Sequence, residues 1–199
     1  MGAHPGCIIE QDLPAFSKAR APLPDLGREP PPFMYHPVDL RPLRVAEYTD
    51  QDVVTPVHLR IARAAGANHW WLDWPIGVRH HHHRTRRDDA VTRLQAVQER
   101  NHAHLTNWGP LTVIASERST CAGCAFPLGE LTLAQRRKLE CIAGVEPVMP
   151  PDGEWNCQDW VMSVLRKATH VGVMDVETVN GAVEEALAVP TACRILYHG

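Results

Sequence analysis

Apolar and basic residues alternate in the segment VHLRI at positions 57–61. A period of two predicts a half-buried β-strand. The turn residues Gly66-Ala67-Asn68 follow, and the aromatic segment HWWLDW at 69–74 predicts a second strand, which Pro75 and Gly77 should end. Together the two strands predict an antiparallel hairpin.

Four later segments carry apolar residues at the spacing of a helix. The clearest begins after Asn156, a residue suited to cap a helix N-terminus, and runs to about residue 168. Its apolar stripe consists of Trp160, Val161, Val164, Leu165 and Ala168. Helices are also predicted from the capping-box segment TLAQ at 132–135 to about Ala143, at 176–187, and at 88–100, where apolar residues recur every third position.

Further strands are predicted at 111–115 and 194–197, whereas the basic, histidine-rich run at 79–87 predicts a solvated loop. These elements predict an α+β domain at residues 53–199, with a small antiparallel sheet and helices packed against it. Nine of the 17 prolines lie in the first 42 residues, so residues 1–52 are expected to form an extended or irregular arm over the domain.

Composition narrows the class of protein. The net charge of −3 and the pI near 6.4 give no sign of a nucleic-acid partner. No run of 18 apolar residues predicts a membrane span, and the N-terminus lacks the pattern of a signal peptide. The six cysteines then favour reduced thiols in the cytoplasm. No glycine-rich phosphate loop is present, so we expect no cofactor, and nothing identifies a partner protein.

Cys157 is the leading candidate for chemistry. The cap at Asn156 places it in the first helical turn, where unpaired N–H groups and the helix dipole favour a thiolate. It shares the face of the apolar stripe, so it should point inward near two tryptophans. A thiol nucleophile also needs a base, and His69 at the start of the aromatic strand is a candidate. The alternative is a small core cysteine and a scaffold histidine.

The segments NHWWLDW at 68–74 and WNCQDWV at 155–161 resemble the two motif blocks of permuted papain-like proteins, in the NlpC and lecithin retinol acyltransferase group. They also resemble a set of uncharacterised fungal proteins with an His-Trp-Ala-Leu strand, a Tyr-His-Val-Thr-Asn-like segment and a Trp-Asn-Cys-Gln-x-Trp-Val helix. The segment HLTN at 104–107 would be the middle element. The resemblance covers about residues 55–174 and implies a permuted papain-like fold.

This resemblance implies Cys157 as nucleophile, His69 as general base and His104 as the third member, with His81 as the alternative. The implied function is a cysteine-dependent hydrolase or acyltransferase that acts on a hydrophobic small molecule. The residues expected to bind that substrate are Trp70, Trp71, Trp155, Gln158 and Trp160. Trp71 stands where the families have a small residue, which would narrow or reshape the pocket.

Two alternatives stay open. A papain-like shell without hydrolysis would suit a natural-product tailoring or cyclising protein, similar to a pericyclase, in which an aromatic pocket orients a reactive substrate. Cys121 and Cys124 have the spacing of a zinc knuckle, with His102 and His104 upstream. A single CxxC without a second matching pair is a weak signal, so we expect no metal.

Overall fold

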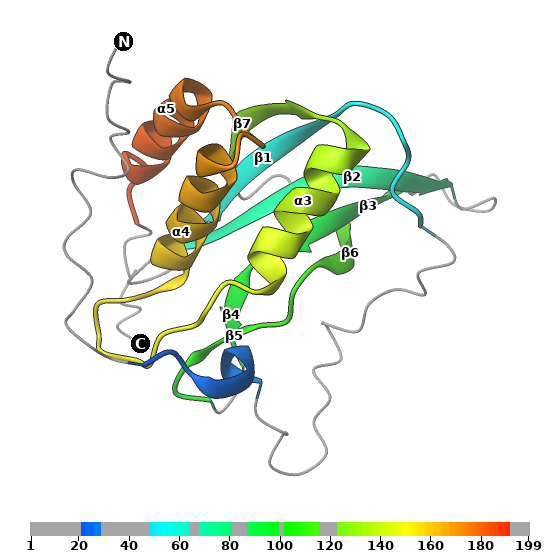
Figure 1. Ribbon diagram of the computed structural model, residues 1–199. Helices are drawn as coiled ribbons and strands as arrows, with labels where there is room; N and C mark the ends of the chain where they lie inside the picture. The colour runs from blue at the N-terminus through cyan, green and yellow to red at the C-terminus, as the bar shows by residue number, and fades with distance from the viewer. Residues whose placement is uncertain are drawn as a thin grey trace, which may run out of the picture.

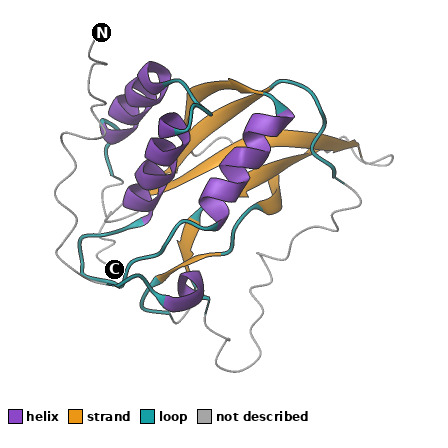
Figure 2. Ribbon diagram, in the orientation of Figure 1, coloured by secondary structure: helices purple, strands orange, loops and turns teal. Residues whose placement is uncertain are grey.

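The computed structural model describes residues 21–28, 48–63, 68–80, 87–99, 102–115 and 123–191. Within these ranges, five antiparallel strands form a sheet in the order β6-β3-β2-β1-β7. Three helices lie across one face of this sheet (Figures 1 and 2). The predicted α+β class with a small antiparallel sheet is therefore confirmed.

The bounds of the elements are as follows. The strands of the main sheet are β1 (Thr55–Ala62), β2 (His69–His80), β3 (Arg87–Leu94), β6 (Leu111–Ala115) and β7 (Gly123–Leu131). A two-stranded sheet consists of β4 (Ala96–Gln98) and β5 (Leu105–Asn107). The helices are the short 3-10 turn η1 (Pro24–Gly27), followed by α3 (Leu133–Gly144), α4 (Cys157–His170) and α5 (Val176–Leu187). None of them, in the described part of the chain, is long and apolar enough to cross a bilayer.

The hairpin predicted from the alternating and aromatic segments is confirmed as β1 and β2, which pair antiparallel. The prediction that Pro75 and Gly77 end the second strand is wrong. Strand β2 continues to His80, because the register shifts between Pro75 and Gly77 and pairing with β3 then resumes. A bulge of this kind accommodates the missing proline N–H without ending the strand.

The helix predicted at 88–100 is also wrong, because β3 and β4 occupy this segment. Strand β3 lies between β2 and β6 and pairs with both. The spacing of the apolar residues suggested a helix, but pairing with β2 and β6 overrides this local preference. The loop predicted at 79–87 is wrong at both of its ends, because Arg79 and His80 belong to β2 and Arg87 belongs to β3. Its remaining residues, 81–86, lie outside the described ranges.

The other helices and the strand at 111–115 are confirmed. Thr132 and Asn156 each cap their helix, and each forms a complete capping box with the residue three positions later. Helix α5 has the predicted bounds and is capped by Asp175, whose side chain accepts a hydrogen bond from the Thr178 N–H. The strand predicted at 194–197 lies outside the described residues.

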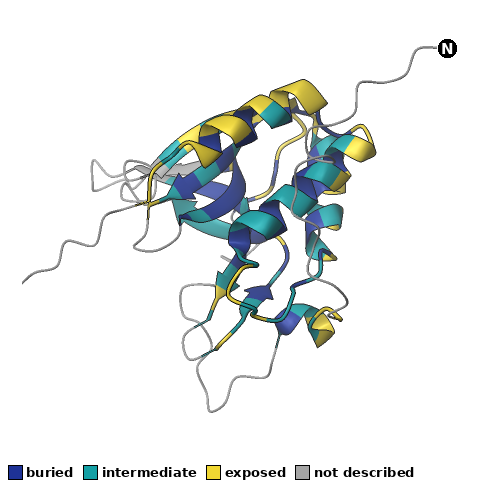
Figure 3. Ribbon diagram, turned by 90° about the vertical axis from the view of Figure 1, so that its left-hand side faces the viewer, coloured by how far each residue is buried: buried dark blue, intermediate teal, exposed yellow. Residues whose placement is uncertain are grey.

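The hydrophobic core lies between the helices and the facing side of the sheet. Every second residue of β1 and β2 enters it, including Leu59, Ile61, Trp70, Leu72 and Trp74. The stripe of α4 packs against them, as predicted from its spacing. Figure 3 shows each helix turning its buried residues toward the sheet and its exposed residues outward. The opposite face of β1, β2 and β3 is left to a different set of side chains.

Parts of the predicted N-terminal arm belong to this packed structure. The Leu23 N–H donates to the Val148 carbonyl at 2.8 Å, and Tyr48 and Asp50 are buried. Asp50 forms a two-point ion pair with Arg136 of α3, which is fully buried. The domain core therefore includes residues that precede position 53.

Candidate functional site

Cys157 lies at the first position of α4, against the start of β2. Its Sγ is 3.8 Å from the Asn68 carbonyl oxygen, and the residue is buried. The Gln158 side chain donates from Nε2 to the same carbonyl at 3.1 Å. At its start, over residues 69–71, strand β2 pairs with β1 but not with β3, and α4 begins beside this part of the strand. The inward orientation expected for Cys157 is confirmed.

The expectation that Cys157 tends toward a thiolate is wrong. Burial raises the pKa of its thiol, and this effect exceeds the opposing influence of the nearby N–H groups of Trp70, Cys157 and Gln158. Desolvation penalises the charged form of a thiol, as it does for a buried carboxyl group. At neutral pH the buried Cys157 side chain is therefore a protonated thiol.

His69 lies on the other side of β2 from the core. Its ring stacks on Trp71 with 5.6 Å between centroids, and its Nε2 is 3.2 Å from Oε1 of Gln95. Trp70, between them in sequence, faces the core with α4. Burial lowers the pKa of His69, so the ring is neutral at pH 7. Among the described residues no hydrogen bond joins the His69 ring to Cys157.

His104 lies beside the two-stranded sheet. Its Nδ1 is 2.9 Å from the Leu105 carbonyl oxygen, and its ring is 5.3 Å from that of His102. Asn107, at the end of the same predicted middle element, is fully buried and donates to the carbonyls of Ala143 and Glu146. Its contacts join β5 to the end of α3. His81, the alternative third member, lies outside the described residues.

The tryptophans expected to line a substrate site have different surroundings. Trp70 and Trp160 are about 1% exposed and belong to the hydrophobic core. Trp155 is partly buried and packs against the core at the entry to α4. Trp71 is buried on the opposite face of the sheet, beneath the guanidinium of Arg93, whose Cζ is 4.7 Å from the ring centroid.

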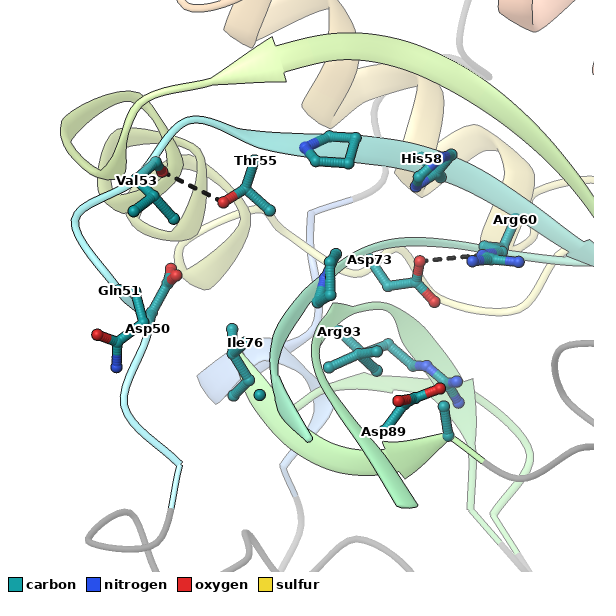
Figure 4. Close-up of a pocket in the computed structure, with 15 residues that line it drawn as sticks. Asp50, Gln51, Val53, Thr55, His58, Arg60, Asp73, Ile76, Asp89 and Arg93 are labelled. Atoms are coloured by element: carbon teal, nitrogen blue, oxygen red, sulfur yellow. Dashed lines mark hydrogen bonds and ion pairs between the residues drawn. The ribbon is translucent and has the colours of Figure 1, made fainter. Parts of the chain in front are cut away.

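A cavity of about 530 Å³ lies over that opposite face (Figure 4). Its walls come from β1, β2, β3 and the end of β6, and from the segment that precedes β1. The apolar lining consists of Val53, Pro56, Pro75, Ile76, Val91 and Ala115. A cavity of this volume is in the range that accommodates small molecules.

A polar row crosses the floor of this cavity. His58 of β1 is directly opposite Asp73 of β2, which is directly opposite Arg93 of β3. Arg60 donates from Nε to Asp73 Oδ1 at 3.0 Å, and Trp71 donates from Nε1 to Asp73 Oδ2 at 2.9 Å. Both carboxylate oxygens are thus engaged, and two guanidinium groups flank one carboxylate.

Two buried atoms of this row lack partners. Nδ1 of His58 and Nε of Arg93 have no hydrogen bond within the described structure. Burial is the main cause that lowers the pKa of His58, and the charge of Arg60 adds to it. Burial also lowers the pKa of Arg93, although an arginine remains charged at neutral pH. Buried polar groups without partners are uncommon and require an explanation.

The zinc-knuckle alternative gains no support from the described residues. Cys124 lies in β7 as a free thiol, and Cys121 lies outside the described ranges. No group of three histidine, cysteine or acidic residues within those ranges is placed to hold a metal ion.

The fold defines a small α+β domain with helices on one face of an antiparallel sheet. Comparisons with protein-family models, with curated proteins and with solved structures gave no match to this chain. The papain-like family stays a hypothesis that rests on the two sequence motifs.

Sequence reasoning missed the polar row. The alternation in β1 places His58 and Arg60 on the face away from the core, and Asp73 is a charged residue within an aromatic strand. These two signals indicated a polar face. The place of Arg93 in the row could not be predicted, because Arg93 was assigned to a helix and only the register of β3 places it beside Asp73.

Proposed function

We propose that the protein holds a hydrophobic small molecule in the cavity on the face of the sheet opposite the helices, without covalent attachment. This is the natural-product tailoring or cyclising alternative, with the pocket moved from the tryptophans of the core to the opposite face. The observation that carries it is the cavity of about 530 Å³, in which apolar side chains adjoin a row of polar and charged ones. Binding and orientation of a reactive substrate would then supply the acceleration.

The cavity is a better candidate than the thiol because two of its polar atoms, Nδ1 of His58 and Nε of Arg93, are buried without a hydrogen-bond partner in the described structure. Cys157 is protonated at neutral pH, and His69 is hydrogen-bonded to Gln95 rather than to the sulfur. The three described cysteines are free thiols, which supports a reducing compartment such as the cytoplasm.

A neutral fluorescent probe, N-phenyl-1-naphthylamine, tests the proposal by titration against the whole chain. Val91 lines the cavity, so Val91→Phe should fill part of it and weaken probe binding at least tenfold. Ala115→Phe, at the end of the edge strand β6, tests the same volume should Val91→Phe fail to fold. The control is Val145→Phe, because Val145 is 73% exposed and does not line the cavity. Equal probe affinity in all four proteins would refute the proposal.

A cysteine-dependent hydrolase or acyltransferase is the second candidate. It is favoured by the three backbone N–H groups near the Cys157 sulfur, of Trp70, Cys157 and Gln158, which could stabilise an oxyanion. Cys157→Ala separates the two candidates. A thiol enzyme would lose its turnover completely, whereas a cavity that works by shape should keep probe affinity within about twofold, because the cavity lining does not include Cys157.

A further inference from the structure

The polar row of the cavity, defined as His58, Arg60, Asp73 and Arg93, has an unequal charge balance. Asp73 contributes one negative charge, while Arg60 and Arg93 contribute two positive charges. Both oxygens of Asp73 already accept hydrogen bonds, from Arg60 and from Trp71. The row therefore carries one positive charge that no group within it balances.

Arg93 is the source of this surplus. Within the described residues its guanidinium makes no hydrogen bond or ion pair, and its Nε is buried without a partner. Its Cζ lies 4.7 Å from the centroid of the Trp71 ring, and Figure 4 shows Arg93 among the residues that line the cavity. A preorganised guanidinium fork matches the two oxygens of a carboxylate.

Other charges on the walls do not remove the surplus. Asp89 also lines the cavity, but it has an interaction of its own, and Figure 4 marks no ion pair between it and Arg93. Asp50 is paired with the buried Arg136. His58 is uncharged at neutral pH, and its unpartnered Nδ1 adds a hydrogen-bonding group on the same floor.

From this balance we infer that the ligand of the cavity carries a single carboxylate, bound by Arg93 beside Arg60, on an otherwise apolar body. The inference rests on the proposed function, since it names the substrate class of the same cavity. One surplus positive charge suits a monoanion better than a phosphate dianion, which would need a second one. The apolar walls from Pro56, Pro75 and Val91 would contact the rest of the ligand.

Calorimetric titration with 1-naphthaleneacetate and with its neutral amide tests the inference, because the two probes share one apolar body. The carboxylate should bind at least tenfold more tightly than the amide at pH 7.5. Arg93→Gln should reduce this preference to nearly one while it leaves the affinity for the amide within about threefold. Arg137→Gln is the matched control, because Arg137 is an exposed arginine of α3 and its replacement changes the net charge equally.

The outcomes separate the inference from the proposed function. Equal affinity for both probes in the natural protein would overturn the carboxylate and retain the cavity as a binding site. A preference that survives both Arg93→Gln and Arg60→Gln would overturn it as well. Binding of neither probe would overturn both statements. Should Arg93→Gln fail to fold, Arg60→Gln is expected to lower the preference at least threefold, and an unchanged preference would refute the inference.

Discussion

The buried pair of Arg136 and Asp50 offers a sharp test of how the cavity wall is built. Arg136 is 0% exposed, and its guanidinium donates five hydrogen bonds. Two go to the Asp50 carboxylate, and the others go to the carbonyls of Gln51, Val53 and Leu131. Since Asp50, Gln51 and Val53 line the cavity, this one side chain fixes the segment that forms its rim.

Replacement of Arg136 by Met keeps helix propensity nearly constant but leaves the Asp50 charge buried without its partner. Breaking a buried ion pair from one side costs about 3–5 kcal/mol of the free energy of unfolding, and the three carbonyls also lose their donor. Urea denaturation followed by circular dichroism measures this loss, provided that the slope with denaturant stays constant.

Arg137→Met is the matched control for this measurement. Arg137 is the next residue of α3, and its side chain is 52% exposed in an ion pair with Glu140. Exposed pairs contribute about 0–1 kcal/mol, so this variant should remain near the natural stability. A loss below about 1 kcal/mol for Arg136→Met, or equal losses for the two variants, would refute the reasoning. A double variant with Asp50→Leu should lose less than the sum of the single losses, because the unpaired charge is then absent.

Four further predictions concern the thiol, the histidine and a helix cap. At pH 7.5 iodoacetamide should label Cys157 far more slowly than the exposed Cys141, as mapped by mass spectrometry, because burial raises the pKa of Cys157; equal rates would contradict this. A raised thiol pKa also means that stability falls as the pH rises above the ordinary thiol value, and Cys157→Ala should reduce that fall in urea titrations. Burial lowers the pKa of His69, so the unfolded chain binds the proton more tightly, and stability should decline as the pH falls below about 6.5; His69→Gln should flatten this decline, and an unchanged pH profile would count against it. Asn156→Ala should cost about 1 kcal/mol, because the Gln158 N–H loses its acceptor, and no change in the melting temperature would show that the cap is replaceable.

The helices were predictable because their signals are local. A capping residue, its partner three positions later and an apolar stripe all lie within one segment, as in the helix that follows Asn156. Strands depend on partners that lie elsewhere in the sequence. The segment that forms β3 has its apolar residues at a spacing compatible with a helix, and only pairing with β2 and β6 makes it a strand.

The inward position of Cys157 was predictable from the sequence, but the pKa of its thiol was not. Cys157 points inward as its position on the helix required, yet the same burial that directs it inward raises its pKa. The helix dipole acts within one turn and is worth about 1 kcal/mol at most sites, whereas the desolvation of a buried thiolate is the larger effect here. The position of Cys157 at a helix start, and so the effect of the dipole, can be predicted from a sequence motif. The desolvation of its thiol depends on the burial that only the folded structure shows.

Successive side chains of β2 point to opposite faces of the sheet, and this determines which of them can contact each other. Trp70, Leu72 and Trp74 face the helices, whereas His69 stacks on Trp71 on the other side of the strand. Trp71 also donates a hydrogen bond to Asp73 and lies under the guanidinium of Arg93. An unbroken chain of contacts therefore leads from His69 to the floor of the cavity. By contrast, the Cys157 sulfur contacts the backbone carbonyl of Asn68, and no hydrogen bond joins it to the His69 ring among the described residues. Strand β2 therefore supports the cavity on the face of the sheet opposite the helices. His69, which the sequence predicted as the base for the thiol, lies on that same face.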